Sequence, residues 1–180
     1  MSLHQLNLDN GPLTDKGTAH DYLVTYEKEM TKRDNIKLLE IGVWYGGSLK
    51  LWSMWFTNSN IYGIDNFAYP IFGGNPPEES LSPLYTVLTV DSQVKEECPF
   101  EDNMFDYIID DALHDHESIL KTFEIYWPKL KSGGKYFIED VLDNNQLNII
   151  CQRLYGLSYT IYDTRDTHTD NDVLIVITKA

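Results

Sequence analysis

Short apolar segments that end in acidic residues recur along the chain, and helical patterns lie between most of them. The clearest is the segment 105–111, in which the apolar residues stop at Asp110 and Asp111. Apolar runs of this length without alternation are typical of strands that are buried on both faces of a sheet. Strands that follow one another through helices are joined by crossovers, and such strands pair in parallel. The chain is therefore predicted to be an α/β protein with a mainly parallel sheet and helices on both faces.

The same patterns predict seven strands and four helices. The strands are expected at 37–42, 61–65, 85–90, 106–110, 135–139, 159–163 and 172–178. The helices are expected at 18–32, 48–56, 117–130 and 146–155. Gly133 and Gly134 are expected to end the third helix by left-handed capping. The last two strands flank a polar turn with Asp166, Thr169 and Asp170, which predicts an antiparallel hairpin at the C-terminal end.

Length and charge restrict the class of protein and its partners. A chain of 180 residues with 42% hydrophobic and 23% charged residues suits one globular domain. We expect a single domain over 1–180, with 1–33 as an N-terminal lid or helix segment. The net charge of -14 repels phosphate backbones and anionic lipids, so neither nucleic acid nor a membrane is an expected partner. The first residues lack a signal-peptide pattern, so the cytoplasm is the expected location.

The predicted strands deliver acidic residues to one edge of the sheet. Ligands of parallel sheets bind outside the carboxyl ends of the strands. Acidic residues are also common where strands enter turns, which would account for one or two of them but poorly for five. The first five strands end at Glu40, Asp65, Asp91, Asp110 with Asp111, and Glu139 with Asp140. This edge is therefore the predicted functional site.

The turn after the first strand has the features of a site for a nucleoside without phosphates. Gly42 and Gly46 allow the backbone to approach a ligand closely, but the G-x-G-x-x-G spacing of dinucleotide sites is absent. Two aromatic residues fill the turn where a pyrophosphate would pack, and Glu40 would attract a sulfonium group. Asp65 lies where an acid binds ribose hydroxyls, and S-adenosylmethionine fits this combination. The predicted cofactor-binding residues are Glu40, Gly42, Gly46, Ser48, Asp65, Asp91, Ser92, Gln93 and Asp110.

Four segments of the chain resemble a known family, in the order in which that family has them. They are TDKGTAHDY at 14–22, LEIGVWYGGS at 39–48, DDALH at 110–114 and GGKYFIED at 133–140. With them the chain resembles the class I S-adenosylmethionine-dependent methyltransferases. More narrowly, it is similar to the metal-dependent sugar O-methyltransferases of macrolide biosynthesis, the macrocin and mycinamicin type. The resemblance implies their Rossmann-like fold, S-adenosylmethionine, and Mg²⁺ or another divalent cation.

The resemblance also implies roles for residues at the strand ends. Asp111, Glu139 and Asp140 are predicted to bind the divalent cation, and His114 is predicted to be the general base. Oxygen ligands favour Mg²⁺ or Ca²⁺, and the ordinary pKa of histidine lies near neutrality. Alternatively, Asp111 caps the following helix and His114 lies on the surface, and His116 is a rival base. This chain has Ala-Leu before the histidine where those family members commonly have Gly-Ser, so the resemblance does not name the acceptor.

The leading hypothesis is an O-methyltransferase that acts on a hydroxyl of a small sugar-like or natural-product acceptor. One alternative is a metal-dependent hydroxylase of the cephalosporin-hydroxylase-like type, for which two histidines and one carboxylate would hold iron. The other is a non-catalytic module that binds S-adenosylmethionine. Residues 66–83 are expected to form an acceptor-side loop, whose Tyr69 and Phe72 either pack on an acceptor ring or anchor the loop. Lys16 and His20 either close over the site or lie on the surface, and a homo-oligomer is left open.

Overall fold

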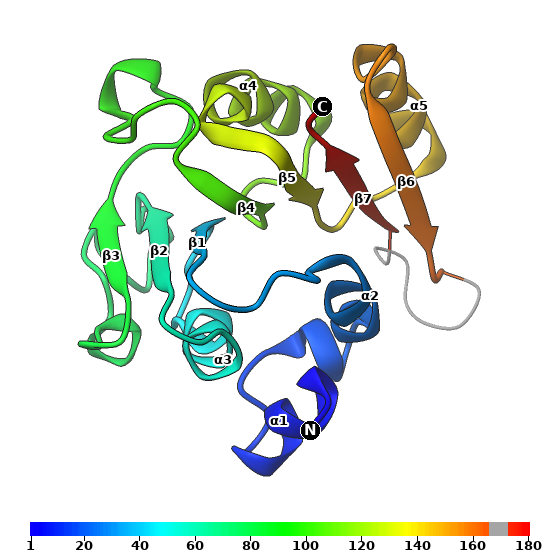
Figure 1. The fold of residues 1–180 in the computed structure, drawn as a ribbon. Coiled ribbons are helices and arrows are strands. Elements are labelled where there is room, and N and C mark those ends of the chain that lie inside the picture. The colour runs from blue at the N-terminus through cyan, green and yellow to red at the C-terminus, as the bar shows by residue number, and fades with distance from the viewer. Residues whose placement is uncertain (166–172) are drawn as a thin grey trace.

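The computed structural model describes residues 1–165 and 173–180, which form one seven-stranded sheet with helices on both sides (Figure 1). The strand order is β3-β2-β1-β4-β5-β7-β6. The neighbours among β1 to β5 pair in parallel, and β7 is antiparallel to both β5 and β6. The strands are β1 (Lys37–Ile41), β2 (Asn60–Asp65), β3 (Thr86–Thr89), β4 (Phe105–Asp110), β5 (Leu130–Ile138), β6 (Ser158–Asp163) and β7 (Val173–Thr178). The predicted fold, a mainly parallel sheet with a C-terminal antiparallel hairpin, is confirmed.

The helices form two layers, one on each face of the sheet. α4 and α5 lie on one side, and α1, α2 and α3 lie on the other (Figure 1). The α-helices are α1 (Leu3–Asp9), α2 (Tyr22–Glu29), α3 (Gly47–Trp55), α4 (His116–Tyr126) and α5 (Asn144–Arg153). Short 3-10 helices are found at Asp15–Gly17, Glu78–Ser80, Lys95–Glu97 and Trp127–Lys129. Within the described residues, no helix has both the length and the apolar character that crossing a membrane requires.

The buried side chains form two clusters, one on each face of the sheet. Ile108 of β4 belongs to the cluster that contains Phe123 of α4. Ile109, the next residue, belongs to the cluster that contains Tyr26 of α2 and Trp52 of α3. Successive residues of a strand point to opposite faces, so a strand that is covered on both sides is buried along its whole length. This explains why the sequence of β4 shows no alternation of apolar and polar residues.

The N-terminal segment contains a helix, α1, that the sequence pattern did not predict. The buried Asn7 side chain accepts hydrogen bonds from the backbone amides of residues 13–14, at 2.8 and 3.2 Å, and so ties the following loop to this helix. α2 is shorter than the helix predicted at 18–32. The amides of residues 18–20 donate to the carbonyl of Asp15 instead, which makes a turn before α2 begins.

Gly133 and Gly134 lie inside β5 instead of ending a helix. Gly134 packs so closely on β4 that an added Cβ would lie 2.9 Å from the carbonyl oxygen of Asp106. Glycine in a strand often marks such a close approach of two backbones. The polar turn predicted for the C-terminal hairpin, with Asp166, Thr169 and Asp170, lies outside the described residues.

Candidate active site

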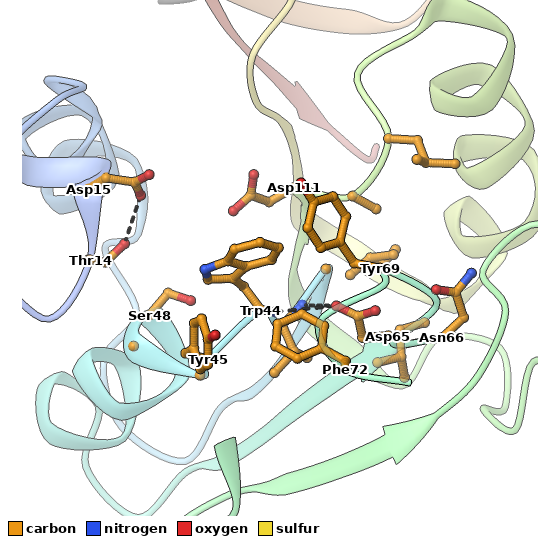
Figure 2. Close-up of a pocket in the computed structure, with 18 of the residues that line it drawn as sticks. Thr14, Asp15, Trp44, Tyr45, Ser48, Asp65, Asn66, Tyr69, Phe72 and Asp111 are labelled. Carbon is orange, nitrogen blue, oxygen red and sulfur yellow. Dashed lines mark hydrogen bonds between the residues drawn. The ribbon is translucent and has the colours of Figure 1, made fainter. Parts of the chain in front are cut away.

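A cavity of about 1260 Å³ opens at the carboxyl ends of the central strands (Figure 2). Its walls come from residues 11–15, the turn after β1, the loop after β2 and the residues that follow β3 and β4. The predicted site residues in its wall are Gly42, Gly46, Ser48, Asp65, Asp91, Ser92, Gln93, Asp111, His114 and Asp140. Three others, Glu40, Asp110 and Glu139, are not in the wall. A cavity of this size exceeds what one small ligand usually needs, so it can hold two molecules side by side.

The turn after β1 depends on its glycines. Gly42 has φ +93°, and a Cβ at this position would lie 2.1 Å from the carbonyl oxygen of Asp111. Gly46 has φ +77° and precedes the first residue of α3. L residues with side chains rarely adopt these angles, and no side chain fits between Gly42 and β4. The turn therefore keeps its backbone bare and close to the end of β4.

Asp65 shapes this turn through its carboxylate. Oδ2 accepts hydrogen bonds from the amides of Val43 (2.9 Å) and Trp44 (3.2 Å), and Oδ1 accepts from Phe67 (2.7 Å). Figure 2 shows the bond that joins Asp65 to the turn. Trp44 has φ +50°, a left-handed conformation that is costly for a bulky residue. The carboxylate predicted to bind ribose thus also stabilises a strained turn.

Glu40, which was predicted to bind the cofactor, lies outside the cavity wall. Its side chain is fully buried, and Oε2 accepts hydrogen bonds from Ser48 Oγ (2.8 Å) and Trp52 Nε1 (3.1 Å). Burial raises the pKa of Glu40 to about 7, against the opposing effect of the Lys16 ammonium. Both partners belong to α3, so they hold the Glu40 carboxylate on the face of the sheet that α3 covers.

Asp110, which was also predicted to bind the cofactor, lies outside the cavity wall too. It is buried, and its Oδ2 accepts a hydrogen bond from the hydroxyl of Tyr136 at 3.3 Å. Burial raises the pKa of Asp110 to about 8. Because successive side chains of a strand point to opposite faces of the sheet, Asp110 and Asp111 point in different directions, and only Asp111 reaches the cavity.

Asp111, His114 and Asp140 form a group that could hold a metal ion, with one ligand atom from each within 4.8 Å of the others. His114 Nε2 lies 3.8 Å from Asp140 Oδ2, and Tyr22 donates a hydrogen bond to Asp140 Oδ1 at 2.8 Å. Burial, followed by repulsion from Asp111, raises the pKa of Asp140. Within the described residues this is the one such group, and it has one histidine and two carboxylates, whereas the hydroxylase alternative requires two histidines and one carboxylate. Asp115 caps α4 by accepting from Ser118 N at 3.0 Å, so Asp111 does not serve as that cap.

Glu139 is not a member of this group and faces the N-terminal segment. Its Oε2 accepts a hydrogen bond from Lys16 Nζ at 2.8 Å, and its Oε1 accepts from the hydroxyl of Tyr26. The predicted ligand role of Glu139 therefore stays a proposal, because both of its oxygens have partners in this structure.

Lys16 is one of the two residues whose position the sequence left undecided. Only 1% of its surface is exposed. Its Nζ lies 2.5 Å from Asp111 Oδ2, 2.8 Å from Glu139 Oε2 and 3.5 Å from Glu40 Oε1. Burial lowers the pKa of Lys16, but the carboxylates of Asp111, Glu139 and Glu40 outweigh it and raise the pKa well above its ordinary value. No local pattern marks this lysine, because its partners lie on strands far along the chain.

His20 also lies at the site rather than on an open surface. Its Nδ1 is 3.8 Å from Asp140 Oδ1, and its ring stacks on Tyr22 with centroids 5.2 Å apart. The N-terminal segment therefore brings one ammonium and one imidazole to the acids of β4 and β5.

Aromatic rings gather on the part of the cavity wall that faces Asp111 (Figure 2). The ring of Trp44 lies 5.2 Å from that of Tyr69 and 5.1 Å from that of Phe72, both in edge-to-face geometry. Trp44 and Tyr69 are 51% and 58% exposed, so their faces are open to a ligand. The loop expected on the acceptor side thus contributes aromatic surface to the cavity.

Comparison with known proteins now adds to this geometry. A model of the family described as "methyltransferase domain" matches residues 39–141. The chain belongs to this methyltransferase family. The matched part contains the glycine turn, Asp65 and the acids at the ends of β4 and β5. The membership that the sequence motifs predicted is confirmed.

The similar curated proteins are O-methyltransferases of the type predicted from the motifs. Demethylmacrocin O-methyltransferase of Streptomyces fradiae is 30% identical over 134 residues, which are 69% of this chain and 33% of that protein. L-olivosyl-oleandolide 3-O-methyltransferase of Streptomyces antibioticus is 29% identical, with 69% of this chain and 33% of that protein covered. The chain therefore spans about a third of the length of these relatives.

Solved structures confirm the fold. The MycE methyltransferase of the mycinamycin pathway, in complex with Mg and SAH, matches with a TM-score of 0.74 and 19% identity. The match covers 100% of this chain and 55% of that one. A TehB-like methyltransferase from Corynebacterium glutamicum matches with a TM-score of 0.60 and 18% identity, over 85% of this chain and 84% of that one.

Proposed function

We propose that this chain transfers a methyl group from S-adenosylmethionine to a hydroxyl of a small sugar-like or natural-product acceptor, with the help of a divalent cation. The observation that carries the proposal is one cavity that joins the glycine turn of a methyltransferase to the group of Asp111, His114 and Asp140. Two of the curated relatives are named as O-methyltransferases of an olivosyl and a rhamnosyl compound, which supports the acceptor class.

The charges in the cavity wall favour a cationic cofactor. Carboxylates line it near the glycine turn and at the strand ends, and a sulfonium group is attracted to such a surface. The acids in the wall are Asp15, Asp65, Glu79, Asp91, Asp111 and Asp140, and Lys50 lines it as well. The bare backbone at Gly42 lets the turn lie directly against the residue that follows β4. A phosphate-bearing cofactor would meet repulsion at the same surface.

The residues present also fit a divalent cation. Four carboxylates, of Glu40, Asp111, Glu139 and Asp140, lie at or below this end of the sheet, and the ammonium of Lys16 balances one of their charges. Within the described residues, Glu40 Oε1 is buried and accepts no hydrogen bond, and Lys16 Nζ lies 3.5 Å from it. We assign the cation to Asp111 and Asp140, with Glu139 as the adjoining carboxylate. A cation bound there would lower the pKa of the acceptor hydroxyl.

His114 is the proposed proton acceptor. Its side chain is 34% exposed toward the cavity and lies beside the carboxylate of Asp140. In the reaction, the acceptor oxygen forms a bond to the methyl carbon, the sulfur keeps the electron pair of the broken bond, and the hydroxyl proton passes to His114. Residues 11–15 and the aromatic side chains of the loop after β2 line the same cavity as His114.

Calorimetry with S-adenosylmethionine, with and without MgCl₂, tests the first part of the proposal. We expect micromolar-range binding, and absence of binding under both conditions would refute the proposal. The second part is tested by following S-adenosylhomocysteine release with a panel of hydroxylated glycosides. His114→Ala should abolish turnover and keep cofactor binding. His116→Ala is the matched control, because His116 is the first residue of α4 and does not line the cavity.

A further inference from the structure

The ammonium of Lys16 sits among carboxylates that three different strands deliver. Glu40 is in β1, Asp111 follows β4 and Glu139 follows β5. A buried ammonium is costly unless it is paired, and removal of one partner from such a set leaves the others uncompensated. Lys16 therefore holds these carboxylates in fixed directions, since two of them approach it within 3 Å.

The same lysine belongs to the segment that forms one wall of the cavity. Residues 11–15 and Thr18 line the cavity on either side of it. The backbone of this segment packs against the start of α3, where a Cβ added to Gly47 would lie 1.8 Å from the carbonyl oxygen of Leu13. Lys16 is thus a direct link between the wall beside the glycine turn and the acids at the strand ends.

We propose that Lys16 is a positioning residue that fastens the N-terminal wall of the cofactor cavity to Asp111 and Glu139, and that its ammonium fills the inner side of the acid group so that a divalent cation binds on the outer side, at Asp111 and Asp140. This inference rests on the proposed methyl transfer. The side chain of Lys16 would then both hold the N-terminal wall in place and direct the cation to the outer side of the acids.

The proposal predicts that the loss of Lys16 changes two affinities in opposite directions. Without the link, the wall no longer holds the cofactor, so the affinity for S-adenosylhomocysteine falls. Without the ammonium 2.5 Å from Asp111, a divalent cation meets less repulsion, so its affinity rises. A lysine that only supported the fold would not produce this pair of effects, because a loosened site binds both ligands less well.

The test compares Lys16→Met, Lys28→Met and the wild type by calorimetry with S-adenosylhomocysteine and with MnCl₂ at pH 8. Lys28→Met is the matched control, since Lys28 lies in α2 and pairs with Tyr162 outside the cavity. For Lys16→Met we expect at least tenfold weaker binding of S-adenosylhomocysteine and at least tenfold tighter binding of Mn²⁺. Weaker binding of both ligands, or no change in either, would overturn the proposal.

If Lys16→Met does not fold, a second pair of variants tests the same proposal. Glu139→Gln removes one of the acids, so Lys16→Met in that background leaves a smaller charge imbalance. The double variant should again bind S-adenosylhomocysteine more weakly and Mn²⁺ more tightly than Glu139→Gln alone, and the reverse order would refute the proposal.

Chemical labelling of the wild type needs no variant. Lys16 should react with acetic anhydride much more slowly than Lys28, as read by mass spectrometry, and equal rates would show that the ammonium is not enclosed. If the wild type bound no S-adenosylhomocysteine, the proposed function would fail. Labelling and the Mn²⁺ titrations would still decide the placement of Lys16.

Discussion

Gly47→Ala should destabilise the protein although alanine is the better helix former. Gly47 is the first residue of α3, where the change by itself would favour the helix by up to about 1 kcal/mol. The added Cβ would lie 1.8 Å from the carbonyl oxygen of Leu13, and contacts below 3.0 Å essentially never occur. The N-terminal segment must therefore move away from α3 by more than 1 Å.

That movement breaks contacts that hold the segment in place. Asn7 Oδ1 accepts hydrogen bonds from Leu13 N (2.8 Å) and Thr14 N (3.2 Å), each worth roughly 1 kcal/mol. Overpacking adds about 1–3 kcal/mol at a site that cannot relax. After the gain in helix propensity is subtracted, we expect the free energy of unfolding to fall by about 2–4 kcal/mol.

Urea denaturation at 25 °C measures this change. Met54→Ala is the control, because Met54 is an exposed residue of the same helix and its substitution should stay within about 0.5 kcal/mol of the wild type. The moved wall should also weaken the binding of S-adenosylhomocysteine in Gly47→Ala. If Gly47→Ala were as stable as the wild type or more stable, the close packing of the N-terminal segment on α3 would be refuted.

Three further changes test other parts of the molecule. Burial raises the pKa of Asp106, but hydrogen bonds from Lys131, Lys32 and the amide of Lys37 outweigh it and hold the pKa below its ordinary value. Asp106→Asn should therefore cost about 1 kcal/mol at pH 7, and urea titrations should show the difference vanish as the pH falls below about 4. Asp115→Ala removes the cap of α4 and should lower stability by about 1 kcal/mol in thermal denaturation; an unchanged melting temperature would contradict this. The side chain of Tyr69 is more than half exposed, so Tyr69→Ala should keep the free energy of unfolding within about 0.5 kcal/mol and leave S-adenosylhomocysteine binding unchanged in calorimetry. A large loss of cofactor binding would move Tyr69 from the acceptor side to the cofactor side.

The strands and the edge that carries the site could be predicted because their signals are local. An apolar run that stops at acids marks both the strand and its carboxyl end, as in β4. The direction in which each acid points could not be predicted from the sequence, because it depends on partners far along the chain. Lys16 and Glu139 are 123 positions apart, and no local pattern relates them.

The incorrect predictions of local structure have a similar cause, which is the dependence of an element on contacts outside it. α1 has only seven residues, and its contacts with the rest of the chain are made by Leu3 and Leu6 in the core and by the bonds of Asn7 to a loop, which is too short a pattern to recognise. Gly133 and Gly134 give the same signal whether they end a helix or allow two strands to approach. Only the contact of Gly134 with the backbone of Asp106 distinguishes the two cases.

The contact between Gly42 and Asp111 determines how precisely the two proposed reactants can be aligned. The amide of Asp111 donates to the carbonyl of Ile41 at 2.9 Å, and no side chain separates this part of β1 from the residue that follows β4. In the proposed reaction, the turn after β1 lies beside the sulfonium, and the side chain of Asp111, which follows β4, holds the cation that binds the hydroxyl. The backbones that carry these two parts of the site are kept at the spacing of adjacent strands, about 4.8 Å in any sheet. Acceptors of different sizes could be accommodated by changes in the loop after β2 without altering that spacing.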